Sequence, residues 1–427
     1  MLNNIYKPVI GLEIHIQLKT KTKMFCSCPN SWEAEPNSKT CPICLGLPGA
    51  IPTINKLAVD LVVRTSQALN CTINSDSFFE RKNYFYPDLP KGFQISQHRK
   101  PIGINGFLEL KSGKKINISD VHLEEDTGKS MHTDQGTLLD FNKCGIPLME
   151  IVSGPEIESA EETVEYSKKI YQLARWLEAS DCDMEKGQMR LELNISLRPE
   201  ESIDLPSYKV EVKNINSFKF LKAAIDYEIK RQTEIFEKGQ TPVQENRGFD
   251  DVKGKTVSQR EKEEAHDYRY FPEPDLPPLR LETKPLTEIL PNQAFNKLLK
   301  SLKLPMAMAE QLTREKSVYE FFQNLVKEGM GPVEAGNIII NKPVVLQEDP
   351  KTINQKSKIK NQNLIKDDTI INNIVEKVLA SNPKVVADYK AGKEEAIKFL
   401  MGQVMKESKG QADPQLASQK LQELHKK

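Results

Sequence analysis

The sequence lacks any surplus of charge. Its 427 residues include 60 Lys and Arg and 60 Asp and Glu, so the formal net charge at pH 7 is zero. Any attraction to nucleic acid or to an anionic membrane must therefore be local. No apolar run approaches the ~20 residues that a membrane-spanning helix needs, and no signal or transit peptide is recognisable. We therefore expect a cytoplasmic protein with no membrane partner.

Two catalytic signatures are also missing. A P-loop has a glycine, four further residues and then Gly-Lys-Ser/Thr, but Leu123 and Phe249 occupy the position of the first glycine. ATP, if it is used, must be bound in another way. The sequence has no Gly/Ser-rich amidase stretch around a Ser-Lys pair and no cysteine in a nucleophile elbow. We therefore predict that this chain does not release ammonia from glutamine.

The order of the expected elements predicts an α+β fold. Residues 1–290 contain short alternating segments interrupted by two helical patterns, of which one begins with the capping box Ser159/Glu162 and the other ends at Gly239. Strands and helices without regular βαβ alternation favour a largely antiparallel sheet. Beyond it we expect a helical region over 291–345, a polar linker over 346–372 and a helical tail over 373–427. Residues 351–427 contain 15 Lys against 9 Asp and Glu, so this part is locally basic.

Four of the seven cysteines form two close pairs, and an odd total argues against a disulfide framework. The pairs are Cys26/Cys28 and Cys41/Cys44, a spacing that lets four thiolates surround a zinc ion. Such a site leaves no open coordination position, so we expect the zinc to be structural. Four free thiols or a redox pair are the alternatives. We assign the isolated cysteines, Cys71, Cys144 and Cys182, to packing.

Several expected strands carry unusual polar faces. Period-two alternation places Glu13 with His15, and His122 with Glu124 and Asp126; a further strand presents Arg190, Glu192 and Asn194. The consecutive residues Glu124, Glu125 and Asp126 repel one another unless a cation lies nearby. Oxygen-rich clusters with histidine suit Mg²⁺ and nucleotide phosphates. A solvated face with no ligand is the alternative.

A segment in which basic and aromatic residues alternate spans residues 81–97. It presents Lys82, Tyr84 and Lys91 around two prolines, which suits contact with phosphates or bases. A tightly packed surface loop is the alternative. A similar segment occupies residues 267–278.

Taken in order, seven motifs resemble those of one known family. They are GLEIH (11–15), CPICLGLPG (41–49), RKNYFYPD (81–88), HLEED (122–126), PLMEIVS (147–153), KNINSF (213–218) and DYRYFPEPD (267–275). In them the sequence resembles the B subunits of the aspartyl-/glutamyl-tRNA amidotransferases. The resemblance covers most of residues 1–290 and resumes at NPKVV (382–386) and FLMGQVM (399–405).

This resemblance implies a fold and an activity. The fold would be a cradle-like catalytic domain over 1–290 with a zinc-binding insertion, a helical domain, and a small tail that binds tRNA. The subunit would phosphorylate the side-chain carboxylate of Glu-tRNA(Gln) or Asp-tRNA(Asn) with Mg²⁺ and ATP, and ammonia would displace the phosphate. The ammonia would come from an amidase subunit (GatA), which assembles with this chain and a small subunit (GatC) in a heterotrimer.

The matching motifs also imply roles for individual residues. The expected catalytic residues are Glu13, His15, Lys82, Glu124, Glu125 and Glu150, and four of these, Glu13, His15, Glu124 and Glu125, would also hold Mg²⁺. We expect substrate or ATP to contact Tyr84, Lys91, His122, Arg190, Glu192 and Lys213.

The sequence departs from the family pattern at three places. Glu192 stands where the family usually has Asp, one methylene shorter, so metal coordination there would be indirect. Asn246 and Gln259 replace the usual Thr and Met. The helical domain is abbreviated, because 342–372 is a short polar stretch where the family carries more helix.

Two other functions are compatible with the residues. A catalytically silent, zinc-bearing RNA-binding scaffold would account for the cysteines and the basic tail, but not for the acidic, histidine-bearing strand faces. A ligase that uses free ammonia would account for the absent glutaminase. ATP hydrolysis that depends on tRNA would distinguish the family function from a silent RNA-binding scaffold. Co-purification of a glutaminase would argue against a ligase that uses free ammonia.

Overall fold

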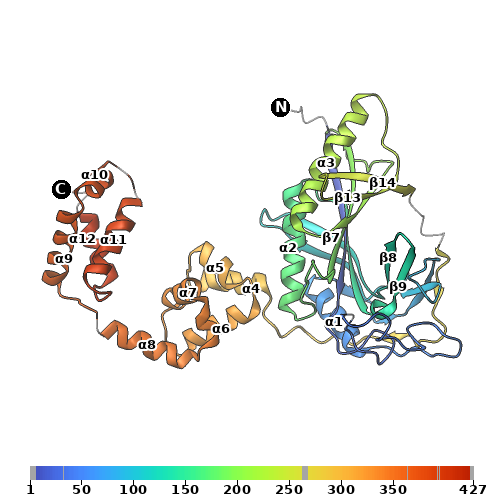
Figure 1. Ribbon diagram of the computed structural model, residues 1–427, viewed down its shortest axis with the longest axis horizontal. Helices are drawn as coiled ribbons and strands as arrows, with labels where there is room; N and C mark the ends of the chain where they lie inside the picture. The colour runs from blue at the N-terminus through green and yellow to red at the C-terminus, as the bar shows by residue number, and fades with distance from the viewer. Residues whose placement is uncertain are drawn as a thin grey trace. The chain divides into compact units, whose positions relative to one another are not determined.

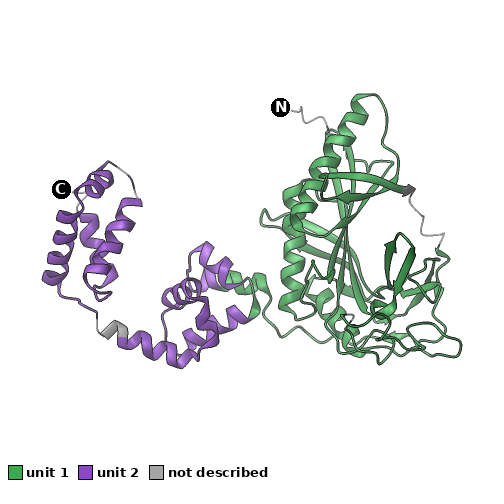
Figure 2. Cartoon of the chain, viewed as in Figure 1, with its two compact units in different colours: residues 1–297, 314–316 green, residues 298–313, 317–427 purple. Residues whose placement is uncertain are grey.

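The computed structural model describes residues 6–31, 33–261, 268–362, 364–391, 393 and 395–423. They belong to two compact units, residues 1–297 with 314–316, and residues 298–313 with 317–427 (Figure 2). Asp267, the first residue of one family motif, lies outside the described residues. No helix among those described is long and apolar enough to cross a membrane.

A large sheet forms the frame of unit 1 (Figure 1). Its described strands, in order across the sheet, are β14 (Lys255–Glu261), β13 (Glu245–Asp250), β12 (Val210–Ile215), β11 (Met189–Pro199), β1 (Tyr6–Gln17), β10 (Pro147–Ser153), β7 (Lys115–Glu125), β6 (Gly103–Glu109) and β2 (Thr72–Ile73). Every neighbouring pair is antiparallel except β12 with β13. The expected α+β fold with a largely antiparallel sheet is confirmed.

Three helices pack on the apolar face of this sheet: α1 (Lys56–Ala68), α2 (Ala160–Trp176) and α3 (Phe218–Glu237). The alternation along β1 explains this packing, because Ile10, Leu12, Ile14 and Ile16 are fully buried against the helices. Both helix limits follow the sequence signals. The Ser159 hydroxyl accepts a hydrogen bond from the Glu162 backbone N–H at the start of α2, and Gly239 has a left-handed φ of 72° just after α3.

Small sheets complete unit 1. The strands β4 (Glu80–Asn83), β5 (Phe93–Ser96) and β15 (Phe271–Pro272) form one of them, β3 (Asp76–Ser77) pairs with β16 (Leu279–Arg280), and β8 (Lys129–Thr133) pairs with β9 (Gly136–Asp140). A short 3₁₀ helix, η1 (Phe141–Lys143), follows β9. The first of these sheets joins the segment near residue 82 to the segment near residue 271, which are far apart in the sequence.

Helices make up most of the remaining chain. They are α4 (Pro291–Asn296), a π-helical turn η3 (Lys297–Ser301), α5 (Met306–Leu312), α6 (Lys316–Lys327), α7 (Pro332–Asn341), a 3₁₀ helix η4 (Pro343–Gln347), α8 (Pro350–Gln362), α9 (Asp368–Ser381), α10 (Pro383–Lys390), α11 (Glu395–Glu407) and α12 (Pro414–Glu423). The last four share a core that includes Ile371, Leu400 and Leu421.

The stretch 346–372, which we expected to be a polar linker, is largely helical. Helix α8 is held by hydrogen bonds from the Asn354 side chain to the Glu328 carbonyl at 2.5 Å and from Ser357 to Glu334. Besides the buried Ile353, this helix packs through polar contacts, so it shows no apolar stripe in the sequence. Four of the lysines that make the end of the chain basic lie in α8, which contains no acidic residue: Lys351, Lys356, Lys358 and Lys360. The positive charge therefore resides largely on α8 and less on the tail.

Candidate active site

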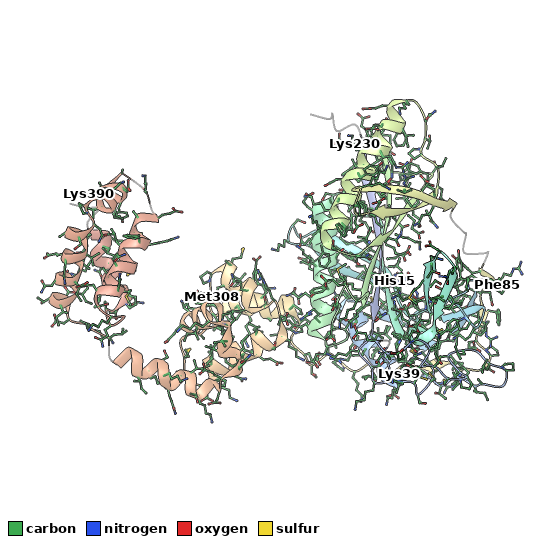
Figure 3. The ribbon with its side chains drawn as sticks, in the orientation of Figure 1. His15, Lys39, Phe85, Lys230, Met308 and Lys390 are labelled. Atoms are coloured by element: carbon green, nitrogen blue, oxygen red, sulfur yellow. The ribbon has the colours of Figure 1, made fainter. Side chains whose placement is uncertain are left out.

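Strand register brings two histidines and a glutamate into one row on the polar face of the sheet. His15 on β1 lies opposite Glu150 on β10, and Glu150 lies opposite His122 on β7. Residues directly opposite in antiparallel strands project to the same face. Glu124 lies two residues beyond His122 and so joins the same face. We call His15, His122, Glu124 and Glu150 the His–Glu centre; Figure 3 shows His15 among the strands of unit 1.

The polar atoms of the His–Glu centre lie within a few ångströms of one another. His15 Nε2 is 3.3 Å from a Glu150 carboxylate oxygen and 3.7 Å from one of Glu124. His122 Nε2 is 3.1 Å from Glu150, and His122 Nδ1 is 2.8 Å from the Asp120 carboxylate. Asp120 therefore orients the His122 ring. We did not predict this role of Asp120; the one signal for it in the sequence is that Asp120 and His122 are two residues apart and so share a face of the strand.

Burial and charge shape the titration of this centre. Burial favours the neutral form of Glu150, but His15 and His122 outweigh it and hold the pKa of Glu150 well below its ordinary value. Burial also opposes the charge on His15, yet Glu150 and its neighbours raise the pKa of His15 to about 9. Burial and the Glu150 charge raise the pKa of Glu124. The two carboxylates therefore repel each other in the absence of additional positive charge.

These donors fit a magnesium ion. One ligand atom from each of His15, Glu124 and Glu150 lies within 4.8 Å of the others. None of the described residues hydrogen-bonds with the buried Nδ1 of His15, so the contacts of the ring with Glu150 and Glu124 are made by Nε2. A set of two carboxylates and one imidazole matches the oxygen-rich chemistry of Mg²⁺ better than that of a structural zinc site.

A second acidic group adjoins the centre on β1 and β11. Glu13 lies opposite Glu192 and accepts a hydrogen bond from the Asn194 amide at 2.8 Å. Burial, followed by the charge of Glu150, raises the pKa of Glu13. Glu192 instead pairs with Lys213 at 2.7 Å, and Lys213 also pairs with Glu211 at 2.8 Å. The longer side chain at position 192 thus has a cationic partner of its own.

Two cations, Lys82 and Arg190, lie near the His–Glu centre. Lys82, on β4, places its ammonium 4.8 Å from the centre of the Tyr268 ring and 5.9 Å from that of Tyr84. Burial opposes the Lys82 charge, but Tyr270, Glu124 and Glu150 outweigh it and raise the pKa of Lys82. This ammonium therefore stays charged at neutral pH beside the two carboxylates.

Arg190 is the second cation, and it pairs with the buried Asp126. It lies opposite His15 in the strand register and contacts Asp126 at 3.0 Å, as does Lys143. Burial works against the charge of Asp126, but Arg190 and Lys143 lower its pKa to about 2. The Lys143 contact comes from the 3₁₀ helix η1 and was not predicted.

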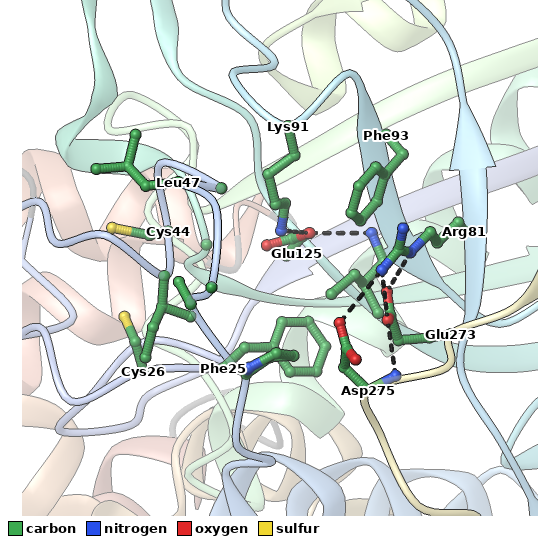
Figure 4. A pocket seen from close by; sticks show the side chains of 17 residues that line it. Phe25, Cys26, Cys44, Leu47, Arg81, Lys91, Phe93, Glu125, Glu273 and Asp275 are labelled. Atoms are coloured by element: carbon green, nitrogen blue, oxygen red, sulfur yellow. Dashed lines mark hydrogen bonds and ion pairs between the residues drawn. The ribbon is translucent and has the colours of Figure 1, made fainter.

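Glu125 and Lys91 lie outside the His–Glu centre, although the family motif led us to expect Glu125 to hold Mg²⁺ together with Glu124. Alternation along β7 turns Glu125 away from Glu124, and Glu125 instead pairs with Lys91 and accepts a hydrogen bond from the Ile95 backbone N–H at 2.9 Å. Both side chains line a cavity of about 230 Å³ together with Cys44 and Arg81 (Figure 4). Three consecutive acidic residues on a strand cannot all face one ligand.

The four paired cysteines converge as the spacing predicts. One sulfur from each of Cys26, Cys28, Cys41 and Cys44 lies within 4.8 Å of the others, and the Cys41 and Cys44 sulfurs are 3.8 Å apart. Tetrahedral zinc with Zn–S bonds near 2.3 Å requires sulfurs about 3.8 Å apart. Lys23 is fully buried, with its ammonium 3.8 Å from the Cys44 sulfur. A positive charge there suits a centre of four thiolates, so the residues fit zinc.

Two family models match the chain. The GatB/GatE catalytic domain matches residues 8–287, within unit 1, and the GatB domain matches residues 339–424, within unit 2. The first match alone spans more than half of the chain.

Curated relatives are similar over nearly the whole length. The B subunit of an aspartyl/glutamyl-tRNA(Asn/Gln) amidotransferase from Persephonella marina is 43% identical over 99% of this chain and 100% of its own length. The proteins of the same name from Thermodesulfovibrio yellowstonii and Elusimicrobium minutum are 41% and 42% identical, over 97% and 96% of this chain and 98% and 97% of their own lengths. The first alignment spans 476 positions, more than the 427 residues of the chain. That relative therefore carries residues that this chain lacks.

Proposed function

This chain belongs to the family defined by the GatB/GatE catalytic domain, and we propose that it activates the side-chain carboxylate of Glu-tRNA(Gln) or Asp-tRNA(Asn) for amidation. A side-chain carboxylate oxygen attacks the γ-phosphorus of ATP, and the bond between that phosphorus and ADP breaks. Ammonia then attacks the carbonyl carbon of the acyl phosphate, inorganic phosphate leaves, and the amide of Gln-tRNA(Gln) or Asn-tRNA(Asn) forms.

The His–Glu centre is the observation that supports this proposal. An anionic carboxylate that approaches ATP is repelled by the phosphate charges, so phosphoryl transfer needs cations at the reacting oxygens. His15, Glu124 and Glu150 would hold Mg²⁺, which would neutralise phosphate charge when it is bound. Asp120 and Glu150 hold His122 between them, and Lys82 brings an ammonium to the same place. Glu13, Glu192, Lys213 and Arg190 border the centre and would contact ATP or the substrate.

We propose that the ammonia comes from another chain. The sequence has no glutaminase signature, which suits assembly with an amidase subunit (GatA) and a small subunit (GatC) in a cytoplasmic heterotrimer. A ligase that uses free ammonia is the competing possibility, and purification of the native complex without a glutaminase would favour it.

The test of the proposed function is ATP hydrolysis by the reconstituted complex in the presence and absence of mischarged tRNA. Activation of the carboxylate predicts hydrolysis that depends on the mischarged tRNA. A complex that binds tRNA and hydrolyses no ATP would instead be the catalytically silent scaffold.

We predict one zinc ion per chain, held by Cys26, Cys28, Cys41 and Cys44. Replacing Cys41 by Ser should abolish zinc binding, because a four-thiolate site loses its closed coordination when one ligand is removed. The matched control is Cys71→Ser, which should retain the metal since Cys71 lies outside the cluster. Elemental analysis of freshly purified protein measures this directly. Absence of zinc from the unmodified chain, with all four thiols free to react, would contradict the prediction.

We predict that the tail binds tRNA. Ile365 forms a bridge with Ala412, so a deletion that removes the tail as a whole covers residues 364–427. The deletion should weaken tRNA binding roughly tenfold or more at low salt and leave the amidase partner bound. Replacing Lys351 and Lys358 on α8 by Gln should make the affinity for tRNA less dependent on salt concentration, because these lysines carry part of the local positive charge. Unchanged tRNA affinity of the deletion variant at moderate salt would refute this role.

A further inference from the structure

Five aromatic rings form a continuous line, and Lys82, which borders the His–Glu centre, lies over two of its inner rings. The ring centres are 5.8 Å apart from Tyr86 to Tyr84, 6.0 Å from Tyr84 to Tyr268, 6.0 Å from Tyr268 to Tyr270, and 4.4 Å from Tyr270 to His98. The last pair is stacked, with 13° between the planes. We call these five residues the aromatic line.

The line is built from two distant segments that the structure clamps together. The Asn83 amide donates hydrogen bonds to the carbonyls of Tyr268 and Arg269, at 3.1 and 2.9 Å. Next to it, β15 pairs with β4, and Arg81 makes two hydrogen bonds to Glu273, at 2.7 and 2.8 Å. Arg269, between two of the tyrosines, has a left-handed φ of 47°, a conformation that is uncommon for a residue other than glycine and concentrates at functional sites.

Cations accompany the rings. The Lys82 ammonium lies over the rings of Tyr84 and Tyr268, and Arg269, between Tyr268 and Tyr270 in the sequence, is exposed. The acidic neighbours, Glu80 and Glu273, are already paired with Arg99 and Arg81. Partly exposed rings with cations alongside are the features of platforms that bind single-stranded nucleic acid.

We propose that the aromatic line stacks the unpaired bases at the 3′ end of the tRNA that carries the amino acid to be amidated. This inference rests on the proposed function, because that function places the aminoacyl group at the His–Glu centre. The aminoacyl group is attached to the terminal nucleotide, so the last base lies within reach of Lys82, where Tyr84 and Tyr268 meet. The preceding bases then follow the chain of rings away from the centre.

The test uses the reconstituted complex and compares intact tRNA with tRNA from which the unpaired 3′ nucleotides have been removed. Tyr268→Ala should raise the Kd of intact tRNA roughly tenfold, as expected for the loss of one stacked base. It should leave the Kd of trimmed tRNA and the KM of ATP unchanged. Tyr268→Phe keeps the ring and should bind as the parent does. Phe85→Ala is the matched control, because Phe85 is an exposed aromatic residue of the same loop outside the line.

Tyr86→Ala provides a second variant, at one end of the line where the ring is exposed. It should weaken the binding of intact tRNA less than Tyr268→Ala does, and this loss of affinity should also require the 3′ nucleotides. Equal losses for intact and trimmed tRNA would overturn the proposal. A raised KM of ATP with unchanged tRNA affinity would also overturn it, because the rings would then hold the adenine of ATP. In either case ATP hydrolysis at saturating mischarged tRNA reports separately on the proposed function, which stands if that hydrolysis persists.

Discussion

Replacing Glu124 by Gln is expected to lower tRNA-dependent ATP hydrolysis and amidation together, by roughly 10²- to 10³-fold. The substitution keeps the shape of the side chain and removes a charge that faces His15 at 3.7 Å. Both activities depend on the same phosphoryl transfer, so they should fall in parallel. Hydrolysis of glutamine by the partner subunit should continue at its basal rate, because that chemistry belongs to another chain.

Glu125→Gln is the matched control, since it makes the same change at the next residue on the opposite face of β7. It leaves Lys91 without its carboxylate partner, so it should lower the stability of unit 1 more than the rate of ATP hydrolysis. Trp176 is buried in unit 1, so its fluorescence reports the unfolding of that unit. Near-parental amidation in both Glu124→Gln and Glu13→Gln would mean that this face is not the active site. Loss of assembly in these variants would instead give the carboxylates a structural role.

Replacing Lys82 by Met is expected to reduce the maximal rate of ATP cleavage by a similar factor of roughly 10²- to 10³-fold. The ammonium lies beside Glu124 and Glu150, whose charges raise its pKa, and it is placed to offset the charge on the transferred phosphoryl group. Single-turnover cleavage of ATP with saturating mischarged tRNA measures this step apart from substrate binding and product release.

Lys82→Arg is the companion variant, because it keeps the charge and changes the geometry. It should retain more activity than Lys82→Met. If Lys82→Met raises only the KM of ATP and leaves the maximal rate intact, Lys82 binds the ground state of the nucleotide and does not stabilise the transferred group.

The alternation of residues along single strands was enough to predict which side chains share a face. His15 with Glu13, and His122 with Glu124, follow from the two-residue period alone. The same period places Glu125 on the opposite face, where it pairs with Lys91. Our expectation that Glu125 lies with Glu124 followed the family motif and not the strand geometry.

Contacts between strands and between distant segments were not predictable from the sequence. The order that sets β10 between β1 and β7 aligns Glu150 with both histidines, and a different order would separate them. Lys82 and Tyr268 meet through the pairing of β4 with β15, two segments nearly two hundred residues apart. The Lys213 partner of Glu192 likewise depends on the pairing of β11 with β12.

Isotope transfer tests most directly the claim that this chain activates a carboxylate. The reconstituted complex is supplied with ATP, Mg²⁺, ammonia and tRNA charged with glutamate or aspartate in which both side-chain carboxylate oxygens are ¹⁸O. Attack by that carboxylate on the γ-phosphorus predicts that each released phosphate contains one ¹⁸O atom, and that Glu124→Gln slows the appearance of the label as much as it slows amidation. Amide formation accompanied by phosphate without ¹⁸O would contradict activation by phosphorylation.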